Sequence, residues 1–191
     1  MAMLERSSAV ASELAAYLRT RIATPRIGLL WLVVVAAAST SGAMVEPDHG
    51  VFYAALLALL IAQFRLWDDL YDLAHDREHH AQRVLVRAAK LLPFRILLAV
   101  SFATGLGALV LVAEAERGIA YALLVAAFLT LYRVLKRRPA TRLLRTQLVL
   151  LKYPAFILIV APHPLQLRSL AAAMVLYLLL SAYDAHDRTP Q

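Results

Sequence analysis

Six apolar runs approach the length needed to cross a lipid bilayer, and they limit the possible folds of this chain more than any other feature. About 17–25 apolar residues in a helix span the hydrocarbon core. Backbone polar groups in that core must be bonded within the protein, and the runs lack the alternating pattern of barrel strands. We therefore predict an all-α integral membrane helical bundle with about six transmembrane helices. The predicted spans are Gly28–Met44, Val51–Trp67, Leu91–Ala113, Gly118–Leu135, Leu148–Ala161 and Ser169–Tyr183.

Composition agrees with a membrane protein. The chain is 61% apolar with a mean hydropathy of +0.65, against about 45–50% apolar residues in ordinary globular proteins. Residues 1–26 are more polar but carry a periodic apolar face that includes Val10, Leu14, Tyr17 and Leu18. We expect them to form a cytoplasmic interfacial amphipathic segment ahead of a transmembrane domain over residues 27–191. The absence of cysteine excludes disulfide and thiolate chemistry.

The positions of Lys and Arg predict the orientation, because these residues gather on the cytoplasmic side of inserted helices. With the amino terminus inside, the connections on the opposite side are Val45–Gly50, Glu114–Arg117 and Pro162–Arg168. They hold only two of the twenty basic residues, Arg117 and Arg168. This asymmetry predicts an integral protein of the cell inner membrane with a cytoplasmic amino terminus. It also accounts for the net charge of +7 without a nucleic-acid partner.

An acidic cluster begins where the second span ends. Asp68, Asp72 and Asp76 are spaced four apart, so on a helix they share a face, with Asp69 beside them. Like charges at this spacing repel by about 0.2–0.5 kcal/mol per pair, which a cation would offset. Oxygen ligands suit Mg²⁺, which commonly bridges carboxylates to substrate phosphates. The cluster therefore predicts a Mg²⁺ site for a phosphorylated, lipid-like substrate.

Two further charged segments follow spans on the same predicted side. The basic segment at residues 132–138 ends the fourth span, and the acidic segment Asp184–Asp187 ends the sixth. A metal-bound diphosphate needs carboxylates for the metal and Arg or Lys for the phosphate oxygens. We expect the segments to converge on one cytoplasmic active-site mouth. Lys152 lies within the fifth span, where ionisable residues face a cavity or a partner. Pro154 is expected to kink that span.

These segments resemble motifs of the UbiA superfamily of intramembrane prenyltransferases. Residues 68–76 (D-D-x-x-D-x-x-x-D) resemble the first aspartate-rich motif. Residues 132–137 (Y-R-x-x-K-R) resemble the family's Tyr-Pro-x-x-Lys-Arg segment, with Arg133 where proline is usual. Residues 184–187 (D-x-x-D) resemble the second aspartate-rich motif. The order of the motifs and their places at helix ends also agree with the family.

The resemblance implies a UbiA-like bundle around a cavity that opens to the membrane. It implies a transferase that moves an isoprenyl group from an isoprenyl diphosphate to a lipophilic acceptor, with Mg²⁺ as cofactor. The implied catalytic metal ligands are Asp68, Asp69, Asp72 and Asp76, the second metal falls to Asp184 and Asp187, and the substrate diphosphate contacts are Tyr132, Arg133, Lys136, Arg137 and Lys152.

Several alternatives remain open at this point. The match covers the front part of a typical family member, and Gln191 stands at the last acidic position of the second motif. A second copy or a partner subunit is therefore expected to complete the cavity. A non-catalytic, isoprenoid-binding or partner-supporting membrane subunit, or an intramembrane terpene cyclase, would carry the same motifs.

Each motif also has a simpler interpretation. The segment Arg65–Arg95 would be a solvated loop helix, with surface ion pairs worth about 0–1 kcal/mol among Asp72, Asp76, Arg83 and Arg87. Residues 136–138 would anchor the topology at anionic lipids, and residues 184–187 would be a solvated tail. Two other chemistries fit less well. The H-x-x-x-H-H spacing at His75–His80 matches one box of the membrane di-iron oxygenases, but the chain has too few histidines for the remaining boxes. The Asp-Gly-x-x-Ala-Arg core of CDP-alcohol phosphotransferases is absent.

Overall fold

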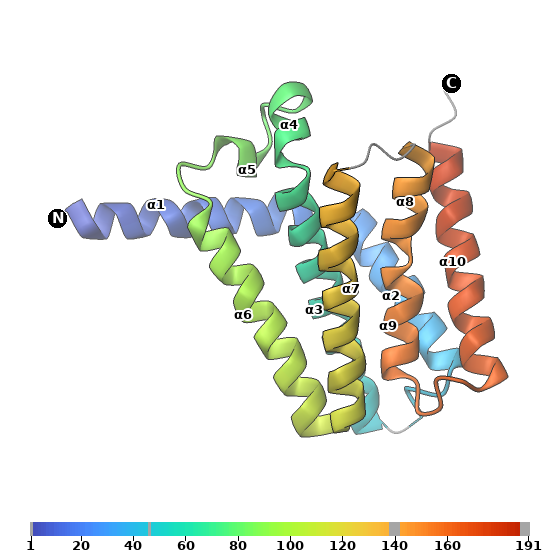
Figure 1. The fold of residues 1–191 in the computed structure, drawn as a ribbon. Coiled ribbons are helices and arrows are strands. Elements are labelled where there is room, and N and C mark those ends of the chain that lie inside the picture. The colour runs from blue at the N-terminus through green and yellow to red at the C-terminus, as the bar shows by residue number, and fades with distance from the viewer. Residues whose placement is uncertain (1, 46, 138–141, 188–191) are drawn as a thin grey trace. The chain divides into compact units, whose positions relative to one another are not determined.

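A computed structural model describes residues 2–45, 47–137 and 142–187, and most of these residues are helical (Figure 1). Most elements are α-helices, and η1 and η2 are short π-helical segments. The elements are α1 (Ala2–Tyr17), η1 (Leu18–Ile22), α2 (Pro25–Thr40), α3 (Pro47–Tyr71), α4 (Leu73–His79), α5 (Val84–Arg87), α6 (Leu92–Ala108), η2 (Leu109–Ala113), α7 (Ala115–Arg137), α8 (Arg142–Leu150), α9 (Lys152–Val160) and α10 (Leu167–Asp187).

The helical prediction is confirmed, and most residues of each of the six apolar runs lie in helices. Within the described ranges, four helical stretches are long and apolar enough to cross a membrane: His49–Tyr71, Leu92–Ala113, Ala115–Leu135 and Leu167–His186. A fifth span results if residues 10–22 and α2, which meet at a bend of 61°, are counted as one. Several apolar helices thus indicate a membrane protein. The count of six membrane helices stays a prediction.

Proline explains why the fifth apolar run is not one long helix. α8 ends at Leu150 and α9 begins at Lys152, so Pro154 lies in the first turn of α9. Proline has no N–H to donate to the carbonyl four residues earlier, which here belongs to Leu150. The neighbouring bond, from the Ala155 N–H to the Leu151 carbonyl, is present at 3.2 Å. The predicted kink at Pro154 is therefore confirmed as a break in the helix.

The chain divides into two compact units built from interleaved segments. Unit 1 contains residues 1–30 and 58–105, and unit 2 contains residues 31–57 and 106–191. The predicted boundary between an interfacial segment and a transmembrane domain, after residue 26, stays a prediction.

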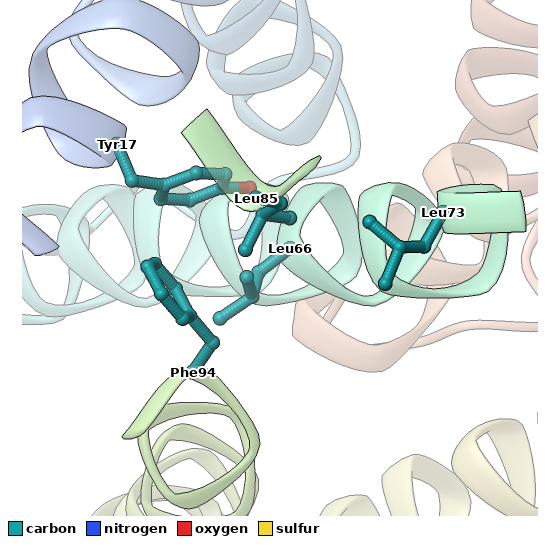
Figure 2. Close-up of a cluster of buried hydrophobic side chains, with 5 residues drawn as sticks. All are labelled: Tyr17, Leu66, Leu73, Leu85 and Phe94. Carbon is teal, nitrogen blue, oxygen red and sulfur yellow. The ribbon is translucent and has the colours of Figure 1, made fainter. Parts of the chain in front are cut away.

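Unit 1 is organised around five buried side chains from five helices, as Figure 2 shows. The rings of Tyr17 and Phe94 meet edge to face with centroids 5.7 Å apart. Leu66 of α3, Leu73 of α4 and Leu85 of α5 complete the cluster. Because α4 and α5 contribute to this core, the segment that follows α3 is packed against the unit and is not a solvated loop. That packing fixes the backbone that carries the acidic cluster.

In unit 2, α9 contacts both α7 and α10 (Figure 1). A polar contact joins α8 to α10, where the Gln147 side-chain carbonyl accepts hydrogen bonds from Tyr177 at 3.0 Å and Ser181 at 2.8 Å. Such bonds are a usual means of joining helices in lipid, where apolar contacts alone have little driving force. Gln147 therefore ties the broken helix α8–α9 to the last span.

Candidate active site

The acidic cluster lies at the junction of α3 and α4, in unit 1. α3 ends at Tyr71 and α4 begins at Leu73, with Asp72 between them. Helical hydrogen bonds nevertheless continue across the junction, from Asp72 N–H to the Asp68 carbonyl and from Asp76 N–H to the Asp72 carbonyl, both at 2.9 Å. The four carboxylates therefore keep the helical spacing expected from the sequence.

Asp69 is contacted by three side chains, those of Tyr17, Arg21 and Arg65. It is 6% exposed, and Arg21 binds both of its oxygens, with Nε 3.0 Å from Oδ2 and Nη2 2.5 Å from Oδ1. The Tyr17 hydroxyl donates to Oδ2 at 3.0 Å, and Arg65 Nη2 lies 3.5 Å from Oδ1. A bidentate guanidinium–carboxylate pair of this kind is among the stronger polar contacts in proteins. Asp69 therefore joins α3 to the amino-terminal segment.

The π-helical segment η1 helps to place these partners. Tyr17 ends α1 and Arg21 lies four residues later within η1. The Ala23 N–H bonds the carbonyl of Leu18, five residues earlier, at 2.7 Å, which is the wider π-type spacing. Residues four apart on a helix lie on one face, so Tyr17 and Arg21 approach Asp69 together.

Asp76 is the second buried carboxylate, with 3% exposure. It pairs with Arg83, which lies in the extended backbone just before α5. Asp69, Asp76, Arg21 and Arg83 all line one small pocket of unit 1, with Tyr17 at its wall. Two carboxylates and two guanidiniums thus line the same space, where the positive charges offset the repulsion expected between the carboxylates.

Asp68 and Asp72 are half-buried and differ in this respect from Asp69 and Asp76. The three carboxylates predicted to share one face therefore differ in exposure. Asp68 and Asp72 are half-buried, whereas Asp76 is buried beside Arg83. The donor set is all carboxylate oxygen, which fits Mg²⁺ chemically. Asp69 and Asp76 already contact guanidiniums, so a metal bound to either carboxylate would compete with an arginine.

Among the residues that the structure describes, no three His, Cys, Asp or Glu side chains are placed to share a metal ion. The His75 and His79 rings stack with centroids 4.2 Å apart. The predicted Mg²⁺ ligands, like the histidine alternative, stay predictions.

The other two motifs belong to unit 2. Tyr132 is buried and meets Phe128 with ring centroids 5.8 Å apart, whereas Arg133 is exposed. Lys152 is 1% exposed, and its Nζ lies 5.3 Å from the ring centroid of Tyr153. Asp184 is half-buried near the end of α10.

The remaining predicted residues of unit 2 are placed only by their backbone. Lys136 and Arg137 end α7, and Asp187 ends α10, as the sequence predicts. Their side chains lie outside the described part of the structure. Convergence of the three motifs on one mouth would involve both units, and it stays a prediction.

Sequence reasoning missed Arg21 and Arg65, the two arginines that contact Asp69. The contact of Arg65 with Asp69 could have been predicted from the sequence, because Arg65 precedes Asp69 by one helical turn. Arg21 and Tyr17 lie 48 and 52 residues from Asp69, and no local spacing identifies such a pair. Asp76 and Arg83 were expected only as two of four residues in surface ion pairs, but they pair with each other and the Asp76 side chain is only 4% exposed.

No protein-family model matches the chain, and no curated protein or solved structure matches it either.

Proposed function

We propose that the chain is a Mg²⁺-dependent intramembrane prenyltransferase. The observation that carries the proposal is the acidic cluster at the end of the apolar helix α3, where Asp68 and Asp72 stand half-buried beside the arginine-paired Asp69 and Asp76. A fixed set of carboxylates at the end of a helix of membrane-crossing length is suited to a substrate with an apolar tail and a charged head.

The reaction would transfer an isoprenyl group from an isoprenyl diphosphate to a lipophilic acceptor. The bond between the allylic carbon and the diphosphate oxygen breaks, and the diphosphate leaves with the electron pair. The acceptor forms the new bond to the allylic carbon and releases a proton. Bound Mg²⁺ would neutralise the diphosphate oxygens and so improve the leaving group.

In this proposal the chain's own residues have distinct tasks. Asp68 and Asp72 hold the metal, while Asp69 and Asp76 position that segment through Arg21 and Arg83. Lys136 and Arg137 would neutralise the diphosphate, with Tyr132, Arg133 and Lys152 as further contacts, and Asp184 and Asp187 would serve a second metal. The apolar helices would keep water from the reacting carbon.

A specific observation favours a second function, a non-catalytic membrane subunit. Two of the four carboxylates in the first motif are already neutralised by arginines of the same unit. A motif that serves only to hold α1, α3 and α5 together would look the same. Binding of substrate separates the enzyme from a purely structural subunit, because a purely structural cluster has no affinity for a metal-bound diphosphate.

The test is binding of farnesyl and geranylgeranyl diphosphates to the purified full chain in nanodiscs, with and without Mg²⁺. The variant is Asp72→Asn, and the matched control is Glu78→Gln, which changes an exposed carboxylate of α4. We expect Mg²⁺-dependent binding that is at least tenfold weaker in Asp72→Asn and unchanged in Glu78→Gln. Absence of binding in folded wild-type protein, or equal binding by both variants, would refute the enzyme proposal and favour the subunit.

A further inference from the structure

A second pocket, in unit 2, has none of the predicted site residues among the described residues of its lining. It has a volume of about 330 Å³, within the range of about 300–1,000 Å³ typical of small-molecule sites. It is formed by three connections, between α2 and α3, between η2 and α7, and between α9 and α10. These are the connections that the charge pattern assigns to the membrane side opposite the acidic cluster. Its charged lining includes Arg117 and Arg168, the two basic residues predicted for that side.

Arg117 is held rigidly in this pocket. Its Nη1 donates to the Tyr53 hydroxyl at 2.7 Å and to the Val160 carbonyl at 2.8 Å. Its Nε lies 3.8 Å from the carboxylate of Glu114, whose side chain is 66% exposed. The guanidinium also lies 5.5 Å from the centre of the Tyr53 ring. A guanidinium has five N–H donors, so these contacts fix its plane and leave donor capacity for a ligand.

Arg168 is the second basic residue of the pocket, and its side chain is held less firmly than that of Arg117. It is exposed at the start of α10 and lines the pocket. No hydrogen bond or ion pair joins its side chain to any other residue in the described ranges. Its guanidinium lies over Gly42, where an added Cβ would stand 2.8 Å from Nη2.

The backbone at Gly42 makes room for this arrangement. α2 ends in a Schellman turn, with the Gly42 N–H bonded to the Ser39 carbonyl at 3.0 Å and the Ala43 N–H bonded to the Ala38 carbonyl at 3.2 Å. Gly42 has φ of +90°, which glycine adopts without strain. The missing side chain at this position lets a guanidinium lie against the turn.

The lining also has an apolar part, which includes Val45, Val112 and Val160. Among the described side chains that line the pocket, two arginines stand against one solvated carboxylate, so the formal charges of these three groups sum to plus one. A phosphate group matches the guanidinium donors. The space exceeds that of a phosphate alone, and the apolar wall suits the glycerol and chain carbons of a lipid.

From this geometry we infer that the unit 2 pocket binds a phosphate-bearing group through Arg117 and Arg168, and that a phospholipid head at the membrane edge is its natural occupant. The inference does not depend on the proposed transferase activity. It assigns a task to the two arginines that no predicted motif uses.

The test measures the midpoint temperature of thermal unfolding of the full chain in a neutral detergent. The chain is titrated with phosphatidylglycerol and, separately, with a diacylglycerol that has the same acyl chains. Inorganic phosphate is compared with chloride at equal ionic strength. A ligand that binds the folded state raises the midpoint. The variants are Arg168→Gln and Arg168→Lys, and Arg95→Gln is the control because Arg95 is an exposed arginine of α6 in unit 1.

We expect phosphatidylglycerol to stabilise the wild-type chain and diacylglycerol to have little effect. The half-saturating lipid concentration should rise about tenfold in Arg168→Gln, less in Arg168→Lys, and not at all in Arg95→Gln. If inorganic phosphate stabilises the chain with the same dependence on Arg168, the phosphate site is supported, and its ligand can be a free anion. Equal effects of the two lipids, or equal behaviour of Arg168→Gln and Arg95→Gln, would overturn the inference.

Discussion

Removal of the Arg21 guanidinium should destabilise unit 1, because it leaves a buried carboxylate without its main partner. Breaking a buried ion pair from one side costs about 3–5 kcal/mol. The cost at Asp69 should be lower, since Arg21 is 21% exposed on its side chain and since Tyr17 and Arg65 still contact the carboxylate. We expect Arg21→Gln to lower the free energy of unfolding by about 2–3 kcal/mol.

Two comparisons isolate the ion pair from other effects of the substitution. Arg19→Gln changes an exposed arginine in the same π-helical segment and should cost less than about 0.5 kcal/mol. Asp69→Asn removes the charge that Arg21 neutralises, so adding Arg21→Gln to it should cost less than about 1 kcal/mol. The double-mutant cycle should therefore give a coupling of about 2 kcal/mol.

The assay is reversible unfolding of the full chain in mixed micelles, followed by circular dichroism as the fraction of denaturing detergent increases. Unfolding curves of equal steepness allow the midpoints of the four variants to be compared. If Arg21→Gln costs no more than Arg19→Gln, or if the coupling to Asp69 is near zero, the bidentate pair does not stabilise the fold and the reasoning fails.

Two further predictions concern packing and backbone geometry. Phe94→Ala should cost about 3–5 kcal/mol of unfolding free energy in the same assay, because Phe94 is fully buried against Tyr17, whereas Ile96→Ala changes a side chain that is 53% exposed and should cost much less. Gly42→Ala should cost about 1–3 kcal/mol, because it combines a φ of +90° with a contact to Arg168, whereas Gly28→Ala meets nothing within 4 Å in α2 and should be neutral or stabilising. Equal effects within either pair of variants would contradict the corresponding prediction.

The helices could be predicted from the sequence because each depends on the combined hydrophobicity of many neighbouring residues. Most residues of every apolar run lie in helices, and Pro154 marks the break between α8 and α9 through the missing N–H. The apolar face of the amino-terminal helix was also foreseen, and its Tyr17 enters the core of unit 1. These features are local, so their physical causes are visible in the sequence itself.

The ion pairs of the acidic cluster could not be predicted in the same way. The contact between Arg21 and Asp69 joins residues 48 positions apart and depends on how α1 and η1 pack against α3. Sequence spacing finds a partner one turn away, such as Arg65, and misses one brought in by tertiary structure. The sequence therefore indicates which residues carry charge at the end of α3, and only the fold indicates which of them are already neutralised.

The pairing of Asp69 with Arg21 also allows its structural and chemical roles to be separated. If Asp69 is a metal ligand, Mg²⁺ and the guanidinium compete for the same oxygens, so Arg21→Gln should strengthen Mg²⁺ binding while it weakens the fold. If Asp69 only positions the segment, losing Arg21 disturbs Asp68 and Asp72, and Mg²⁺ binding should weaken together with stability. Mg²⁺ titration by calorimetry, with Arg19→Gln as the control, measures whether Arg21→Gln raises or lowers the affinity for Mg²⁺. Tighter binding in the destabilised variant would identify Asp69 as a ligand, and weaker binding would restrict the direct ligands of this cluster to its half-buried carboxylates.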